Sequence, residues 1–114
     1  MQYFLTILTA PDAEPYDAVD DDMADWAKEA DERGIHVTGN RLRPLEDATL
    51  VRRRGGELLV TDGPFAEGRE LILGFDVLEC DSIDEAIEFA SRCPMARFGQ
   101  IEVRAAWPFD PDEA

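Results

Sequence analysis

The residues best suited to chemistry lie in one short segment, Asp62-Gly63-Pro64-Phe65. Pro64 fixes its own φ and keeps Gly63 out of the helical region, so the backbone turns at a defined place. Gly63 has no side chain, which lets a ligand approach the backbone closely. Asp62 is then a carboxylate held rigidly at the mouth of a pocket, where it can act as a general base or bind a polar group. Turn chemistry alone also explains all four residues, so a structural interpretation stays open beside the functional one.

His36 is the only histidine of the chain. A lone histidine without a mapped partner is more typical of a surface or strand-edge residue than of a catalyst. We keep it as a candidate ligand-binding residue together with Gly63, Pro64 and Phe65.

No spacing in the sequence predicts a metal or a cofactor. The run Asp20-Asp21-Asp22 lacks the EF-hand pattern and favours a solvated helix start. Cys80 and Cys93 form neither a C-x-x-C pair nor a Cys/His metal set, so we expect free thiols packed as small apolar groups. There is no P-loop, Rossmann fingerprint or nucleophile elbow.

Two helices and several strands must position these residues. Val19, Met23, Trp26, Ala27 and Ala30 follow a helical period, and Gly34 can close that helix in the left-handed conformation. A capping box at 82–85 starts a second helix, whose buried stripe we expect to be Ile83, Ala86, Ile87 and Ala90, and Pro94 stops it.

The strands are predicted at residues 3–8, around 36–38, at 49–54, 57–61, 70–80 and 99–104. Gly55-Gly56 joins two of them in a hairpin in which Val51 opposes Val60 and Arg54 opposes Glu57. In the longest strand Leu71, Leu73, Phe75 and Val77 share one face, with Gly74 and Asp76 on the other.

This order predicts an α+β fold, a ferredoxin-like split βαβ sandwich with an antiparallel sheet and two helices on one face. The opposite sheet face is apolar as well, and packing two such sheets in a homodimer is the simplest way to cover it. We expect a single domain over residues 1–107 and an acidic flexible tail over 108–114.

Composition limits the partners. The chain has 114 residues and a net charge of −15, from 26 acidic and 11 basic residues, so its surface repels nucleic acid and anionic lipid. Arg52-Arg53-Arg54 is the local exception, which we interpret as neutralisation, with Arg54 pairing Glu57. No apolar run is long enough for a membrane span, and the start of the chain does not resemble a signal peptide. Free thiols then favour the cytoplasm.

The sequence also resembles a known family. The run Thr61–Glu67 with Glu70 and Gly74-Phe75 is similar to the core of the YCII-related family in its DGPF-motif branch, and 81–87, Cys93-Pro94 and 99–104 match in order and spacing. The resemblance implies a fold of the dimeric α/β-barrel type, a cleft near Asp62, and Glu70 as a second carboxylate able to divide acid and base roles with it. It also implies a regulatory role beside extracytoplasmic-function sigma factors.

The sequence departs from the family in one respect. Other branches of the family carry a His–Asp pair with the histidine near the first helix, whereas His36 follows that helix. Of that pair, the resemblance therefore carries over only Asp62. Three functions stay open: a small-molecule-binding or regulatory module, a cofactor-free hydrolase, lyase or isomerase that uses Asp62 and Glu70, and a purely structural dimer.

Overall fold

A four-stranded antiparallel sheet forms the centre of the protein. Its strands are β1 (Gln2–Leu8), β2 (His36–Arg41), β5 (Ile72–Glu79) and β6 (Gln100–Ala105), in the order β2-β5-β1-β6. Each neighbouring pair is antiparallel. This α+β arrangement is compatible with the predicted ferredoxin-like fold. The computed structural model describes residues 1–63 and 70–112.

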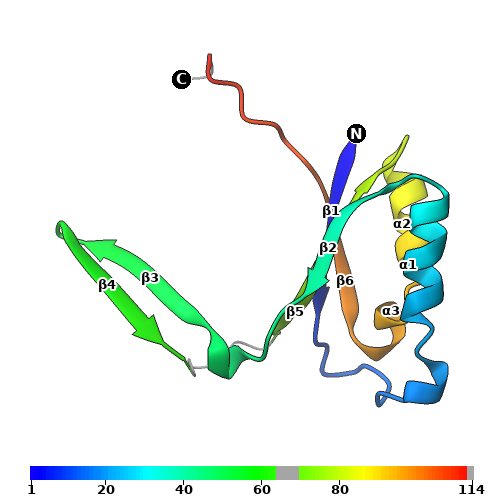
Figure 1. Ribbon diagram of the computed structural model, residues 1–114, viewed down its shortest axis with the longest axis horizontal. Helices are drawn as coiled ribbons and strands as arrows, with labels where there is room; N and C mark the ends of the chain where they lie inside the picture. The colour runs from blue at the N-terminus through cyan, green and yellow to red at the C-terminus, as the bar shows by residue number, and fades with distance from the viewer. Residues whose placement is uncertain (64–69, 113–114) are drawn as a thin grey trace.

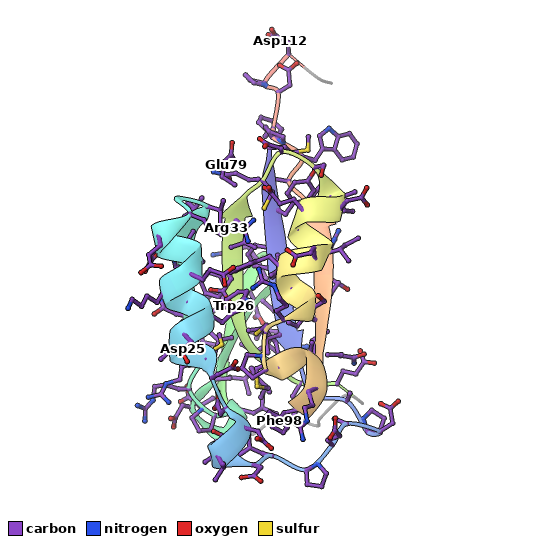
Figure 2. All side chains as sticks on the ribbon, turned by 90° about the vertical axis from the view of Figure 1, so that its right-hand side faces the viewer. Asp25, Trp26, Arg33, Glu79, Phe98 and Asp112 are labelled. Carbon is purple, nitrogen blue, oxygen red and sulfur yellow. The ribbon has the colours of Figure 1, made fainter. Side chains whose placement is uncertain are left out.

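The helices all lie on one face of this sheet (Figure 1). They are α1 (Met23–Glu32), α2 (Ile83–Ser91) and the short α3 (Met95–Phe98), with 3-10 turns η1 (Ala18–Asp20) and η2 (Leu45–Asp47) in the connections. Figure 2 shows α1 and α2 side by side over the strands. Helix α3 was not predicted, because Pro94 was interpreted only as the end of α2, whereas it also occupies the N-cap of α3.

The first helix begins later than its periodicity suggests. Val19 is 91 % exposed because it lies in the 3-10 turn η1, so its place in the predicted apolar stripe was wrong. Asp21 precedes the helix and accepts a hydrogen bond from the Met23 amide. Gly34 closes the helix with a φ of +70°, as predicted.

The core lies between the helices and the sheet. Trp26 stacks on Phe89 with ring centroids 4.7 Å apart, and its indole nitrogen donates to the Phe89 carbonyl at 2.8 Å. Both rings belong to the same buried cluster as Tyr3 and Leu5 of β1, and Leu5 is fully buried. Trp26, which follows the helical period of α1, is therefore a core residue.

The second helix buries a different stripe from the predicted one. Ser82 caps it by accepting from the Glu85 amide, as expected. Ala86, Phe89 and Ala90 are buried, whereas Ile83 and Ile87 are 46 % and 49 % exposed. Phe89 supplies the large buried group, and the two alanines beside it let the helix approach the sheet. Ile83 and Ile87 flank this stripe, so the prediction was wrong for both.

Strand β5 separates a covered face from an open one. Gly74, Asp76 and Leu78 are buried toward the helices. Leu73, Phe75 and Val77 lie on the opposite face, where Phe75 stacks on Phe4 at 5.6 Å. The predicted alternation is therefore confirmed, but the strand starts at Ile72, so Glu70 and Leu71 precede it.

The other two strands form a separate hairpin. β3 (Thr49–Arg54) and β4 (Glu57–Asp62) meet at Gly55 and Gly56, whose φ values are +57° and +81°. The register is the predicted one. The hairpin does not join the four-stranded sheet and projects on the side away from the helices (Figure 1).

Beyond β6 the chain leaves the sheet, with Trp107 and Phe109 87 % and 85 % exposed (Figure 1). Cys80 and Cys93 are free and buried, as predicted. Among the described residues no helix is long and apolar enough to cross a membrane.

Candidate functional site

The predicted loop starts at the end of the hairpin. Asp62, the last residue of β4, is exposed, and its Oδ1 accepts a hydrogen bond from the Thr49 hydroxyl at 3.2 Å. The Gly63 amide donates to the Ala48 carbonyl at 2.8 Å. A Cβ on Gly63 would lie 2.7 Å from the Leu45 carbonyl oxygen, so the close approach of two backbones requires glycine here. Pro64 and Phe65 lie outside the described residues.

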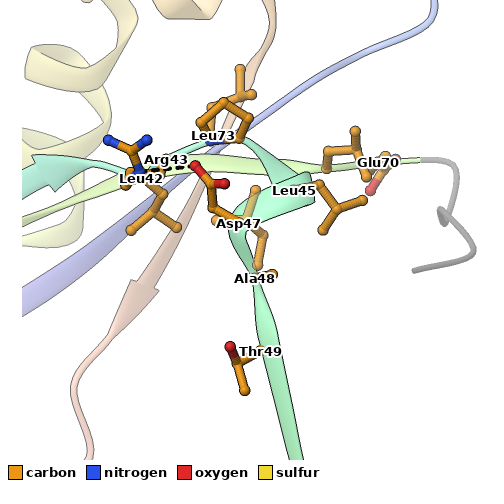
Figure 3. Close-up of a pocket in the computed structure, with 11 residues that line it drawn as sticks. Leu42, Arg43, Leu45, Asp47, Ala48, Thr49, Glu70 and Leu73 are labelled. Carbon is orange, nitrogen blue, oxygen red and sulfur yellow. Dashed lines mark hydrogen bonds and ion pairs between the residues drawn. The ribbon is translucent and has the colours of Figure 1, made fainter. Parts of the chain in front are cut away.

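Glu70 lines a cavity of about 810 Å³ at the base of this hairpin (Figure 3). Its walls come from 42–45, 47–49 and 70–73, and Asp62 is not among them. Within this cavity Arg43 pairs with Asp47 at 2.9 Å. The structure thus places Glu70 and Asp62 near the same hairpin but puts only Glu70 on this wall.

A second group of polar residues lies on the covered face of the sheet. His36, the first residue of β2, has its Nε2 3.2 Å from Asp76 Oδ1. Its Nδ1 lies 3.3 Å from Asp31 Oδ1, near the end of α1. The histidine that seemed to lack a partner in the sequence therefore lies between two carboxylates.

Asp76 is the buried member of this group. It is 7 % exposed and is the one charged residue buried among those described. Burial raises the pKa of the Asp76 carboxyl, and the hydrogen bond from His36 opposes that change. A carboxyl held in this way can exchange a proton with the adjacent imidazole.

Gly39 makes room for the buried carboxyl. It pairs with Asp76 in the β2–β5 ladder, and a Cβ there would lie 2.1 Å from Asp76 Oδ1 and 2.8 Å from the Phe75 carbonyl oxygen. Any larger residue would displace the carboxyl from His36. The sequence of β2 therefore fits the position of Asp76.

The pair opens onto a cavity of about 580 Å³, within the size range of small-molecule sites. Its walls come from β1, β2, β5, α1, α3 and the adjoining loops: Ile7, Asp21, Met23, Ala27, His36, Gly39, Asn40, Arg41, Leu42, Leu73, Gly74, Phe75, Asp76 and Met95. Seven of these residues have apolar side chains and five have polar or charged ones. A lining of this kind suits a ligand with an apolar body and one or two polar groups.

The arrangement supports acid–base chemistry and not nucleophilic attack by sulfur. Imidazolium can donate to both Asp31 and Asp76, whereas the neutral ring can donate to only one of them. Burial raises the pKa of both the Cys80 and Cys93 thiols to about 11, so neither is a thiolate at neutral pH. In the described part of the chain no three His, Cys, Asp or Glu side chains are placed to hold a metal ion.

Asp76 was not among the predicted site residues, although the sequence of β5 contains a signal for it. Residues 71–78 alternate between two apolar faces, and Asp76 is the only charged residue in that run. A carboxyl on the helix-facing side of a strand must be buried, and a buried carboxyl needs a partner. The bulge between His36 and Thr38, which sets the register of β2 against β5, could not be inferred from the sequence.

Fold and site together define a small α+β protein with a histidine–carboxyl pair in a cavity between sheet and helices. The sequence model of the YCII-related domain matches residues 1–110, and the chain belongs to this family. It is also 36 % identical over 105 residues to an uncharacterised protein of Rhizobium meliloti (strain 1021), an alignment that covers 77 % of this chain and 85 % of the relative.

Proposed function

We propose that the protein binds a small molecule in the cavity beside His36 and Asp76, and that this pair moves a proton to or from it. The contact between His36 Nε2 and Asp76 Oδ1, on the wall of a cavity of about 580 Å³, carries this proposal. The ligand has an apolar body that fits against Met23 and Met95. A polar group on the ligand faces the imidazole.

This assignment moves the proposed chemistry away from Asp62 and Glu70. A general base benefits from a setting that shifts its pKa toward neutrality, and Asp76 has such a setting. Asp62 is exposed, and its carboxylate accepts a hydrogen bond from the Thr49 hydroxyl of the same hairpin. A catalytic role for Asp62 and Glu70 stays a prediction, with the cavity at Glu70 as its structural support.

The test uses the methionine methyl groups as reporters. Met23 and Met95 line the cavity, whereas Met1 lies at the start of the chain, beside Cys80. A library of small organic acids, amides and ketones is added to protein labelled with ¹³C at the methionine methyls. Ligands of this site are expected to shift the Met23 and Met95 signals and the ring signal of His36, the chain's only histidine, and to leave Met1 unchanged.

Two variants locate the binding determinant. His36→Gln is expected to weaken those ligands roughly tenfold or more, because a hydrogen bond to a charged group contributes about 1.5–3 kcal/mol. Asp62→Asn, the control, is expected to bind them as the unchanged protein does. If His36→Gln binds equally well, or if ligands shift no cavity methyl at millimolar concentration, the proposal fails.

The working unit in this proposal is a homodimer formed through the open face of the sheet. Phe4 and Leu73 on that face are 41 % and 37 % exposed, and a second sheet would remove them from water. A sigma-factor partner and a cytoplasmic location remain predictions from the resemblance and the composition.

A further inference from the structure

In the part of the chain that the structure describes, the β3–β4 hairpin is almost uncovered. Every residue of β3 is exposed, and in β4 only Leu59 is half-buried. A two-stranded hairpin on its own is marginally stable in water. A stably folded β3–β4 hairpin therefore needs a contact from outside the hairpin. The radius of gyration is 16.7 Å, against about 13 Å expected for a compact chain of this length.

One side of the hairpin is apolar. Val51 and Val60 oppose each other, and Leu58 lies on the same side opposite Arg53. Val51, Leu58 and Val60 are 65 %, 56 % and 58 % exposed. Three neighbouring aliphatic side chains at this exposure form a surface that a partner can cover.

The hairpin stands on the same side as the open face of the sheet. Figure 1 shows it projecting away from the helices, so the open face and the hairpin border one region of space. The open face carries Phe4, Leu73 and Val37, which are 37–49 % exposed. A partner seated against the sheet therefore lies beside the hairpin.

Area and charge favour a second copy as that partner. The strand spacing gives the open face a width of about 19 Å and a length of about 23 Å, and so an area of about 440 Å². This area is smaller than the ~800 Å² that each partner buries in a standard interface. The hairpin adds surface beyond that face. Residues 49–62 contain three arginines and two acids, whereas the whole chain has a net charge of −15, so a second copy offers the complementary acidic surface.

We propose that the β3–β4 hairpin is an arm that holds a second copy of this chain. Its Val51, Leu58 and Val60 side packs against the partner, and Arg53, which lies on the same side, meets the partner's acidic surface. Because the pairing is two-fold, each copy gives one arm and receives one. The arm rests on the homodimer proposed above and adds a second contact region to it.

The experiment measures dimer dissociation by sedimentation equilibrium of the full chain. Val60→Glu places a charge on the apolar side of the arm, and Thr61→Glu places the same charge on its other side, one residue away. Val60→Glu is expected to raise the dissociation constant of the dimer about tenfold or more, as substitutions at buried interface positions do. Thr61→Glu is expected to have a dissociation constant close to that of the unchanged protein. Phe4→Asp, on the open sheet face, reports on the sheet contact separately.

Amide hydrogen exchange shows whether the arm is still folded in these variants. In the unchanged protein, protection of residues 50–60 is expected to rise with protein concentration, and in Val60→Glu this rise is expected to be lost. The arm is overturned if protection is independent of concentration and Val60→Glu and Thr61→Glu have equal dissociation constants. In that case, a weaker dimer in Phe4→Asp would still support the contact through the sheet. A chain that is monomeric at hundreds of micromolar overturns both contacts and leaves ligand binding at His36 to its own test.

Discussion

Asp76 and Asp62 are both carboxylates on β-strands, but their surroundings differ. Asp76 lies on the covered face of the four-stranded sheet at 7 % exposure and contacts His36. Asp62 ends an exposed hairpin, and within residues 1–63 and 70–112 its carboxylate accepts a hydrogen bond from Thr49. Asp62, which belongs to a recognisable sequence motif, has the exposed environment that is usual for an aspartate. Asp76, which belongs to no motif, has the buried and less usual one. In this protein, the capacity of a carboxylate for acid–base chemistry depends more on its burial and contacts than on the sequence motif around it.

The largest effect on the free energy of unfolding is expected from a substitution in the core on the covered face of the sheet. Phe89 is fully buried, stacks on Trp26 and lies under the guanidinium groups of Arg33 and Arg92. Phe89→Ala is expected to lower the free energy of unfolding by about 3–5 kcal/mol, because it leaves a cavity. Urea titration followed by tryptophan fluorescence measures it.

The matched control for Phe89→Ala lies in the hairpin. Leu58 is 56 % exposed, so Leu58→Ala is expected to cost less than about 1 kcal/mol at a concentration where the chain is monomeric. Similar losses from both substitutions would remove the distinction between the two regions.

Much of the secondary structure could be predicted because periodicity, caps and turns act locally. The Gly55-Gly56 turn, the Ser82 cap and the alternation along β5 are properties of a few adjacent residues. The late start of α1 and the exposure of Ile87 depend on how the helices lie against the sheet, which local pattern does not encode.

The candidate site was harder to predict than the fold. The contact between His36 and Asp76 joins residues 40 positions apart, and a shift in the register of β2 against β5 sets their alignment. Asp62 and Gly63 were found from turn chemistry, which the short Gly63–Ala48 contact supports. Turn chemistry places a loop, but it does not state whether a carboxylate on that loop is buried.

A smaller effect concerns the pH dependence of stability at Asp76. Burial raises the pKa of this carboxyl in the folded state, so the folded protein holds its proton to higher pH than the unfolded chain does. The native state therefore loses stability as pH rises from about 4, the usual aspartate pKa, through the folded pKa. Asp76→Asn does not titrate and is expected to avoid that loss.

The measurement compares Asp76→Asn with the unchanged protein in urea between pH 3 and pH 8. The variant's advantage is expected to be near zero at the acid end and to grow as pH rises through the folded pKa of Asp76. His36→Gln in both backgrounds separates the contribution of the imidazole. A variant that is less stable at every pH would show that the contact with His36 outweighs the cost of burial.

The smallest effect is expected at Asp62. Its carboxylate is exposed, and the exposed hydrogen bond that it accepts from the Thr49 hydroxyl contributes little beyond what water supplies. Asp62→Ala is therefore expected to change the free energy of unfolding by less than about 0.5 kcal/mol, and Thr49→Val, which removes the donor of the same bond, by a similar amount. A loss of about 1–3 kcal/mol from Asp62→Ala alone would instead mean that the carboxylate satisfies further groups of its loop. The segment would then be a structural element of the fold, and the contrast with Asp76 would be one between a stabilising carboxylate and a reactive one.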